Sequence, residues 1–403
     1  MINYKKLLWG GVATLLISSA NAVEVKIDNY GYVGALYNQG FVGENKNSST
    51  IGLSARAGAN FYLDNGLTFG LGATGAWAAL DKQSNSFGGL TYTGPAGRYP
   101  NTGDVSDAFV NYKNNNWQIS AGRFDATFFE FDWLANSIQG IGFKYDNLFR
   151  NNVVNKMDIW VTYFNSFLTT GYQPSRIASE LGTMYAYHPG GRNFVGRGGG
   201  NVIAGGLNMN LAGFVLDPFL LFDINPAVSK DILFQIGTRF GYIVDFAKDW
   251  RSSTMLRVMV QVAPDYYLGS RNDVGFLTWI DQEFKYSNWV DFGAGFYYSG
   301  GQDIWSINDN SRFYGKWVNS YNKNYFSENV YSFYVFGEFR LLNNKLNIDV
   351  LLGGGEYIEF SAIAKYRVWQ GKTMKTDVGG GYVYSNLKGR DGDNLLVFAK
   401  LSY

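Results

Sequence analysis

Cysteine is absent from the 403-residue chain, and histidine occurs once, at position 188. Without cysteine the fold depends neither on disulfides nor on thiolate-bound metals. A histidine-based catalytic or metal site would have to be built around His188 alone. This residue lies in YAYHPGGRNFVGRGGGN, a glycine-rich stretch that we interpret as a surface loop. We therefore expect no enzymatic activity, no cofactor and no metal site.

Long apolar runs and an excess of either charge are also missing. Beyond the first 22 residues, no apolar run approaches the ~18 residues of a membrane-spanning helix. The chain has 34 basic and 33 acidic residues, and loss of Lys5 and Lys6 with an N-terminal signal would leave 32 basic residues. This near-neutral balance argues against a nucleic-acid partner.

The N-terminal stretch MINYKKLLWGGVATLLISSANA combines two lysines, an apolar segment and Ala20-Asn21-Ala22. It predicts a signal peptide at residues 1–22, with a retained anchor as the alternative. Residues 23–403 then form a single exported domain. Its 50 glycines, 31 phenylalanines and 29 tyrosines suit a large soluble β protein or a membrane β-barrel.

Apolar residues alternate with polar ones along many segments of ten to fourteen residues. Clear examples are IGLSARAGANFY (51–62), ILFQIGTRFGYIVD (232–245) and STMLRVMVQVA (253–263). Such alternation predicts half-buried strands. At about 3.3 Å per residue and a tilt near 45°, ten or eleven residues cover the ~25 Å apolar band of an outer membrane.

The connections between these segments largely alternate between short and long. Short ones lie at 63–66, 114–116, 211–213, 247–250, 287–288, 343–345 and 370–372, and long ones at 81–104, 167–198 and 300–329. This pattern favours an all-β transmembrane antiparallel barrel of about eighteen strands, with short periplasmic turns and long extracellular loops. The strands run from near Lys26 to Tyr403. Because their number is even, both termini are expected on the periplasmic side.

The chain ends in DGDNLLVFAKLSY, where apolar residues occupy every second position from Leu395 to Tyr403. A closing barrel strand needs one lipid-facing side, and its terminal aromatic suits the membrane interface. We interpret this segment as the last strand of the barrel.

Energetics decides which face of the strands points outward. An arginine facing lipid near the midplane costs about 2–4 kcal/mol. Turning the strands over would expose Arg56, Arg239, Arg257 and Arg340 together, at a cost comparable with the stability of a whole domain. The arginines are therefore expected to point into a polar lumen, which stays open as an aqueous channel at this strand number.

Residues 125–138 are unusually apolar for an outer loop, although they contain Asp125, Glu130 and Asp132. Folding into the lumen would bury Phe128, Phe129, Phe131 and Trp133 against the wall and present the three acids to a pore constriction. The alternative is that these aromatics belong to the membrane-interface girdle or to a subunit contact.

Basic residues gather at inward positions of the last strands and the second strand. The set is Arg56, Arg340, Lys365, Arg367, Lys375 and Lys400. Because the last strand of a closed barrel pairs with the first, these residues are expected to form one basic lumen wall. Glu338 and Glu359 alternate with several of them, so lumen salt bridges explain part of the pattern.

Other lumen charges follow from the same alternation. Arg239, Arg257, Asp281 and Glu283 are expected to face inward. Strict alternation instead points Arg123 outward, which requires either a bulge or a position at the membrane interface.

Together, these features resemble the OprD-like porins, and most closely the related outer-membrane family of Helicobacter and Campylobacter-type bacteria, the Hof proteins. The most specific stretch is Gly122-Arg123-Phe124 followed by SIQGIGF at 137–143. The resemblance implies an eighteen-stranded channel, a constriction from the third loop (Asp125, Glu130, Asp132) and a basic ladder (Arg56, Arg340, Arg367 and neighbours) that guides small carboxylates. It also implies contact with outer-membrane lipid and lipopolysaccharide, assembly through the C-terminal strand by the barrel-assembly machinery, and the homotrimers common among such porins.

Two functions from different classes are compatible with the sequence. The first is a passive porin in the bacterial outer membrane for small hydrophilic solutes. The alternative is a surface adhesin or structural barrel, suggested by loops dense in Tyr, Asn and Gly such as 300–329.

Overall fold

The computed structural model describes residues 25–43, 46–82, 101–134, 137–149, 151, 154–170, 185–189, 201–224, 231–264, 272–305, 311–315 and 326–403. The signal peptide expected at residues 1–22 lies outside these ranges. The strands are β1 (Val25–Gln39), β2 (Ser49–Leu63), β3 (Leu67–Lys82), β4 (Asn101–Lys113), β5 (Trp117–Asp125), β6 (Ser137–Tyr145), β7 (Val154–Thr170), β8 (Tyr185–Pro189), β9 (Asn201–Leu211), β10 (Phe214–Ile224), β11 (Leu233–Ala247), β12 (Trp250–Val262), β13 (Val274–Tyr286), β14 (Val290–Gly300), β15 (Val330–Leu341), β16 (Leu346–Gly355), β17 (Tyr357–Gln370), β18 (Lys375–Leu387) and β19 (Arg390–Ser402). A short 3₁₀ helix, η2 (Thr127–Phe129), follows β5.

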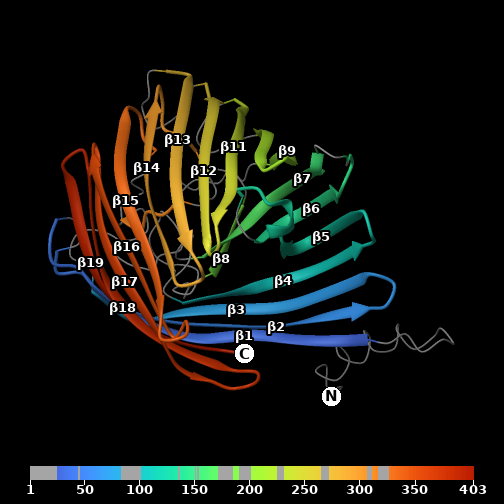
Figure 1. Cartoon of the computed structure of the whole chain (residues 1–403). Helices are drawn as coiled ribbons and strands as arrows, with labels where there is room; N and C mark the ends of the chain where they lie inside the picture. Colours follow the sequence, from blue (N-terminus) through green and yellow to red (C-terminus); the bar gives the residue numbers. More distant parts are fainter. Residues whose placement is uncertain are drawn as a thin grey trace, which may run out of the picture.

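Eighteen of these strands form one closed antiparallel barrel (Figure 1). Each strand pairs with its neighbours along the chain, β7 pairs with β9, and β19 closes the ring against β1. The remaining strand, β8, pairs only with the last residues of β7, between Ser166 and Thr170. The strand number and the antiparallel closure predicted from the sequence are confirmed.

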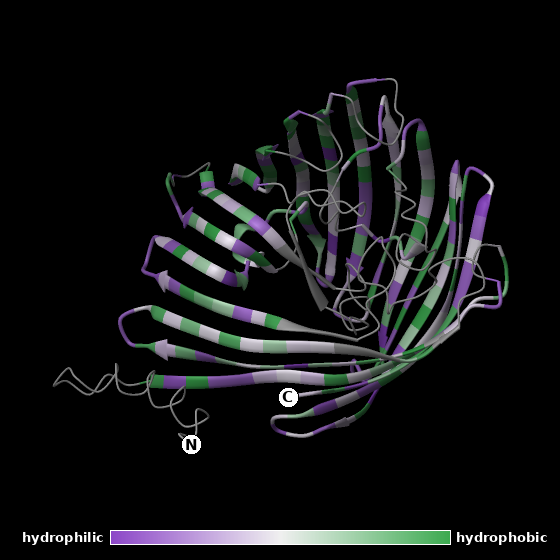
Figure 2. Ribbon diagram, turned by 180° about the vertical axis from the view of Figure 1, so that it is seen from behind, coloured by the Kyte–Doolittle hydropathy of each residue, from purple (hydrophilic) through white to green (hydrophobic). Residues whose placement is uncertain are grey.

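The barrel wall alternates as the sequence predicts, which Figure 2 shows as bands of different hydropathy along the strands. On β15, for example, Phe333 and Val335 are 60% and 54% exposed, whereas Tyr334 and Phe336 between and beside them are buried. Large apolar side chains point outward in the same way on most strands. An apolar outer face of this kind is typical of barrels in contact with lipid. No helix in the described part of the chain is long and apolar enough to cross a membrane.

The two ends of the barrel differ in their connections. At the end that carries both termini, the turns are short, such as 64–66, 212–213 and 342–345. At the opposite end, which we call the loop end, most connections are long. The last two are exceptions, because only Glu356 separates β16 from β17 and residues 388–389 separate β18 from β19.

The C-terminal segment closes the barrel. β19 pairs with β18 on one side and with β1 on the other, from Gln39↔Leu395 to Tyr32↔Ser402. The backbones of Gly31 and Tyr403 then exchange two hydrogen bonds of 3.0 Å, so the closure continues to the last residue. The interpretation of this segment as the closing strand is confirmed.

Buried aromatic residues line the inside of one half of the barrel. The main cluster joins inward side chains of β5–β7 and β9–β17 to residues of two loops. Loop 3 connects β5 and β6, and loop 7 connects β14 and β15. Both loops enter the barrel and position the candidate site.

Candidate functional site

Loop 3 leaves the wall early. β5 and β6 have 9 residues each, compared with 15 in β1 and β2, so the chain turns inward well before the loop end. Asp125 accepts a hydrogen bond from the backbone N–H of Thr127 at 2.8 Å, which supports the start of η2. Glu130 ends η2 with a φ of 58° in the left-handed region.

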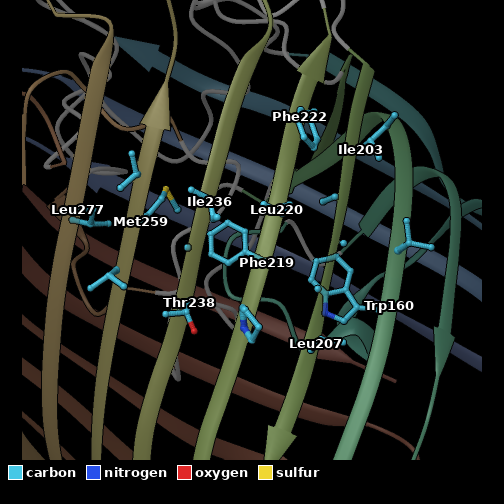
Figure 3. A pocket seen from close by; sticks show the side chains of 18 of the residues that line it. Trp160, Ile203, Leu207, Phe219, Leu220, Phe222, Ile236, Thr238, Met259 and Leu277 are labelled. Carbon is cyan, nitrogen blue, oxygen red and sulfur yellow. The ribbon is translucent and has the colours of Figure 1, made fainter. Parts of the chain in front are cut away.

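Aromatic side chains fix loop 3 against the inner wall. Phe129 is fully buried, and its ring centroid lies 5.5 Å from that of Trp160 on β7. The Phe131 ring packs between Trp160 and Phe219 (both labelled in Figure 3) at tilted angles, with both ring centroids 4.8 Å away. Trp133 meets the edge of Trp279 on β13 at 6.3 Å. Loop 3 is therefore folded inward, as expected, rather than contributing to an interface girdle.

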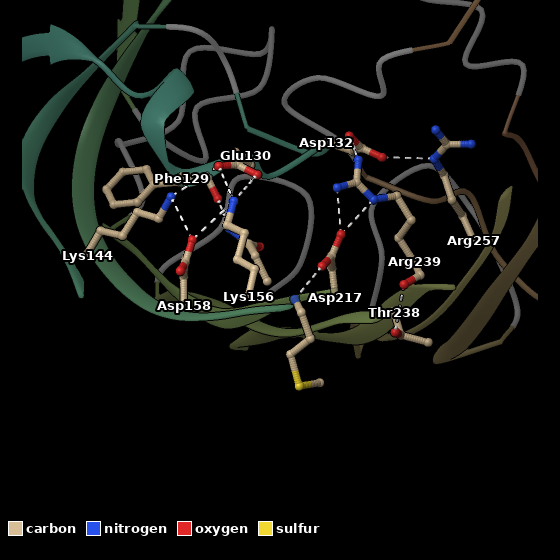
Figure 4. Close-up of polar contacts among 12 residues, drawn as sticks. Phe129, Glu130, Asp132, Lys144, Lys156, Asp158, Asp217, Thr238, Arg239 and Arg257 are labelled. Carbon is tan, nitrogen blue, oxygen red and sulfur yellow. Dashed lines mark hydrogen bonds and ion pairs between the residues drawn. The ribbon is translucent and has the colours of Figure 1, made fainter. Parts of the chain in front are cut away.

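Asp132 ties loop 3 to the middle of β11 and β12. Its carboxylate contacts Arg239 Nη1 at 2.8 Å and Arg257 Nε at 2.9 Å (Figure 4). Arg239 also pairs with Asp217 at 2.6 Å, and Arg257 pairs with Asp281 at 3.0 Å. The result is an alternating row of acids and guanidiniums in which the Asp132 side chain is only 8% exposed.

Glu130 forms a second anchor near the end that carries the termini (Figure 4). Lys156 Nζ lies 2.7 Å and Lys144 Nζ 3.2 Å from its carboxylate, and both lysines also contact Asp158 at 3.2 Å. Burial opposes the ionisation of Glu130, but the hydrogen bond and positive charge of Lys156 and the charge of Lys144 outweigh it. The pKa of Glu130 therefore lies below its ordinary value.

The three loop-3 acids thus have different surroundings. Asp132 is buried in ion pairs, and Glu130, whose side chain is 47% exposed, is held by two lysines. Asp125 is exposed at the end of β5. The expectation that all three acids face a pore constriction therefore stays a prediction, although Asp132 and Glu130 also hold the loop through their ion pairs.

Loop 7 forms a strap across the inside of β11–β13 near the loop end. Gln235 Nε2 donates to the carbonyl oxygen of Trp305 at 2.7 Å, and Gln261 Nε2 donates to that of Asp303 at 2.9 Å. Gln261 Oε1 in turn accepts the backbone N–H of Trp305 at 2.9 Å. Burial raises the pKa of Asp303, although its carboxylate accepts the backbone N–H of Glu328.

Further along loop 7, residues 311–315 pack against β13 and β15–β18. The buried carboxylate of Glu359 accepts the backbone N–H groups of Tyr314 and Gly315, both at 2.8 Å. The Tyr314 hydroxyl donates to Asp349 at 2.9 Å, and Arg312 pairs with Glu283. These parts of 300–329 lie inside the barrel and present no outer recognition surface, contrary to the adhesin interpretation of this loop.

The predicted basic residues share the inner face of β2 and β15–β19. Arg340 and Lys365 both align with Asn347, from opposite sides, in one cross-strand row. Arg367 and Lys400 both align with Asp377 in the row two residues nearer the termini. Across neighbouring strands, Lys375 aligns with Ser402, Ser402 with Tyr32, and Tyr32 with Arg56. The strand register therefore brings the six residues to one region of the wall.

Acidic partners accompany the three arginines of this wall. Arg56 Nη2 lies 2.7 Å from Asp107, Arg340 Nη2 lies 2.7 Å from Asp291, and Arg367 Nε lies 2.9 Å from Asp377. Arg340 also contacts Glu338 at 3.0 Å. In each pair the arginine is the more exposed partner: 18% against 5% for Arg56, 25% against 2% for Arg340 and 22% against 1% for Arg367. The guanidiniums face the lumen and the acids lie closer to the wall.

Arg123 keeps the outward direction that strict alternation implies. It lies near the loop end of β5, where its Nε donates to Gln139 Oε1 at 2.7 Å and its Nη1 to the carbonyl of Val105 at 2.5 Å. The preceding Gly122 has a φ of 104°. A position near the edge of the barrel, one of the two expected explanations, accounts for Arg123.

Metal chemistry has little support in the described residues, which contain no group of three or more His, Cys, Asp and Glu side chains placed to hold a metal ion. His188 lies in β8, where its backbone aligns with Phe167. The glycine-rich stretch after it, up to residue 200, lies outside the described ranges.

Sequence reasoning missed the partners of the loops. Lys144, Lys156 and Asp158 hold Glu130, and Glu359 holds loop 7, but these contacts join segments far apart in the chain. Asp107 is buried on the inner face of β4, but an irregularity in the register at Ser106 interrupts the alternation, so a strict period of two from the exposed Val105 would have pointed it outward.

Comparison with known proteins shows the same architecture. OccAB2 of Acinetobacter baumannii matches with a TM-score of 0.68 at 11% identity, over 94% of this chain and 98% of that chain. OpdK of Pseudomonas aeruginosa, solved with vanillate, matches with a TM-score of 0.66 at 12% identity over the same shares. OprD of P. aeruginosa matches with a TM-score of 0.60 at 10% identity, over 94% of each chain. No family model and no curated protein sequence matches.

The class that the fold defines is therefore the closed eighteen-stranded antiparallel barrel. Within that class, the chain shares the fold of the OprD and OccAB2 structures over 94% of its length.

Proposed function

We propose that this protein is an outer-membrane porin, a passive diffusion channel for small hydrophilic solutes with a preference for anions such as small carboxylates. A barrel of this strand number is too wide for its own wall side chains to fill. Its apolar outer face suits a lipid bilayer, and its charged inner face suits an aqueous path.

We propose that loops 3 and 7 together narrow this path. Loop 3 packs against β7–β13 and loop 7 against β11–β18, so the two loops meet over β11–β13. The remaining path then follows the wall of β1–β5 and β19 at the level of the two loops, and passes Arg340 and Arg367 nearer the end that carries the termini. In this arrangement Asp132 sets the position of the constriction, and Glu130, whose side chain is 47% exposed, and Asp125 are the loop-3 acids open to solutes.

The single observation that carries the anion preference is the asymmetry of exposure in the wall ion pairs. The side chains of Arg56, Arg340 and Arg367 are 18–25% exposed, whereas the side chains of their paired aspartates are exposed at 5% or less. A solute therefore meets positive charge first, even though the wall is nearly neutral overall. Lys365, Lys375 and Lys400 extend the same basic wall.

The substrate class is supported by one structural neighbour. OpdK was solved with vanillate, a carboxylate. We propose small carboxylates for this chain because exposed guanidiniums recognise carboxylates through paired N–H donors.

Three further features belong to the same proposal. The aromatic C-terminal strand would serve recognition by the barrel-assembly machinery, and the outer face would contact lipid and lipopolysaccharide, with a homotrimer as the proposed assembly. The relationship to the Hof family rests on the sequence pattern quoted above. Removal of residues 1–22 as a signal peptide completes the proposed route to the membrane.

Liposome swelling tests the proposal directly. Purified protein in vesicles should admit small carboxylates faster than neutral solutes of similar size. Arg56→Gln should lower the ratio of carboxylate to neutral entry several-fold, because it removes a positive charge from the wall and leaves the negative charge of Asp107 without its cationic partner. Arg123→Gln, the same change on the outer face, should leave the ratio unchanged. Entry rates equal to those of protein-free vesicles would refute the channel.

A further inference from the structure

Tyr30 on β1 lies flat against the inner wall of the barrel. Its backbone aligns with Gly58 on β2, which in turn aligns with Gly72 on β3. A Cβ atom at Gly58 would lie 2.4 Å from both Cζ and Oη of Tyr30, and a Cβ atom at Gly72 would lie 2.9 Å from the same Oη. A van der Waals contact between carbon atoms is about 3.5 Å. The tyrosine therefore needs both glycines to reach along the wall from β1 toward β3.

The row of these glycines leads to the start of loop 3. Gly72 aligns with Asp107 on β4, and Asp107 is buried on the inner face. The adjoining Ala108 aligns with Arg123, so the row continues to Phe124, the last inward residue of β5 before loop 3. Neighbouring strands lie about 4.8 Å apart, which places β1 roughly 19 Å along the wall from β5. The proposed solute path passes through this interval.

The wall of the interval is recessed along the row, because Gly58 and Gly72 have no side chains. Tyr30 is half-buried, with the hydroxyl end of its ring over the glycines and the rest of the side chain bordering the lumen. The ring therefore occupies space that the recess would otherwise add to the path. Because the side chains that line the narrow part of a channel set its size limit, the position of this ring affects the width of the path.

Tyr30 also contacts the cation beside it. Cζ of Arg56 lies 5.3 Å from the centroid of the tyrosine ring, within the ~6 Å of a cation–π interaction. Nη2 of Arg56 lies 2.7 and 2.8 Å from the two carboxylate oxygens of Asp107. The ring and the carboxylate thus hold the guanidinium between them at the edge of the recess.

We infer that Tyr30 is a specificity-determining residue of the channel. Its ring sets the width of the path along β1–β4 and, with Asp107, positions Arg56 beside that path. The inference rests on the proposed porin function, because only a solute that passes along this wall meets the ring. Solutes that are too wide for the gap between the ring and loop 3 are then excluded whatever their charge.

Single-channel recording in planar bilayers tests this inference, with polyethylene glycols of increasing mass as probes of the size limit. Tyr30→Ala uncovers the recess, so it should raise the conductance at least about 1.5-fold and admit polymers of larger mass. It should also move the reversal potential under a potassium chloride gradient toward zero, because the guanidinium of Arg56 loses its support. Tyr30→Phe keeps the ring and should restore wild-type values of all three quantities.

Tyr37→Ala is the matched control on the same strand. Tyr37 aligns with Val397, which is 51% exposed on the outer face, so its side chain lies away from the path. This variant should keep the wild-type conductance and size limit.

Gly58→Ala provides an independent test, because its Cβ would push the Tyr30 ring off the wall and into the path. Its conductance should be lower than that of the wild type. Adding Gly58→Ala to Tyr30→Ala should leave the conductance of Tyr30→Ala unchanged, since no ring remains to be displaced.

Two results would overturn the inference in different ways. Wild-type conductance and size limit in Tyr30→Ala, together with a lower unfolding temperature, would show that the ring only stabilises the wall through its contact with glycine. Absence of conductance in the wild type would instead overturn the proposed porin function, and the inference with it.

Discussion

The Asp132→Asn substitution removes the charge that fastens loop 3 to the barrel wall. The Asp132 carboxylate joins Arg239 and Arg257, but each arginine has a second partner, Asp217 and Asp281 respectively. Neither guanidinium is therefore left without a carboxylate in the variant. The full cost of orphaning a buried charge, about 3–5 kcal/mol, does not apply.

The substitution instead weakens two charge-assisted hydrogen bonds, each of which contributes about 1.5–3 kcal/mol. Part of this loss is offset, because the neutral Asn no longer carries the desolvation cost of the buried Asp132 charge. We expect a net weakening of about 2–4 kcal/mol in the attachment of this part of the loop. Because each 1.4 kcal/mol changes an equilibrium constant tenfold, the population of the detached loop rises by roughly 30- to 700-fold. Trp133 still packs on Trp279, so the loop should open intermittently rather than leave the lumen.

Single-channel recording in planar bilayers measures this effect. We expect transient steps to higher conductance in Asp132→Asn that the wild type lacks. Asp125→Asn is the matched control, because Asp125 is exposed and its described contact is with the backbone of Thr127. Open-channel traces of Asp132→Asn that match the wild type in amplitude and noise would refute the role of this ion-pair row in holding the loop.

Three other variants probe separate parts of the structure. Because the pKa of Glu130 lies below its ordinary value of 4.5, its stabilisation of loop 3 should persist above pH 4.5 and be lost as the pH falls through the lowered pKa. Open-channel noise should therefore rise in wild-type channels at that low pH. Glu130→Gln channels should show the raised noise at every pH. Tyr314→Phe removes the bond to Asp349 and should lower the free energy of unfolding by about 1–3 kcal/mol in urea titrations, a loss that an unchanged midpoint would exclude. Gly122→Ala places a Cβ 2.2 Å from the Ala108 carbonyl oxygen at a φ of 104°, so it should lower the free energy of unfolding by at least about 1–3 kcal/mol. Heat-induced unfolding followed on gels should then occur at a lower temperature than in the wild type. An unchanged unfolding temperature would contradict the strain.

The barrel could be predicted from the sequence because its main determinant is local. Alternation with a period of two records which face of each strand meets lipid, and the cost of turning arginines outward fixes the direction. The same reasoning placed Arg239, Arg257, Asp281 and Glu283 inside, where the structure has them. Loop 3 was also predictable, since Phe129 and Trp133 are too apolar for an outer loop.

Loop 7 was harder to predict, because its Tyr- and Asn-rich sequence is equally compatible with an exposed surface. Its burial depends on Glu359, a residue of β17 that accepts two backbone N–H groups of the loop. Nothing local to residues 311–315 identifies that acceptor. For the same reason the sequence could not assign the acids around Arg340, which pairs with Asp291 on the preceding strand as well as with Glu338.

The most direct test of the channel and its selectivity is the single-channel conductance of the wild type in planar bilayers, with the reversal potential under a potassium chloride gradient. We predict an ohmic pore whose reversal potential shows a preference for chloride, because Arg56, Arg340 and Arg367 are more exposed than their acidic partners. A preference for potassium would contradict the role of this wall. Absence of any conductance would contradict the channel itself.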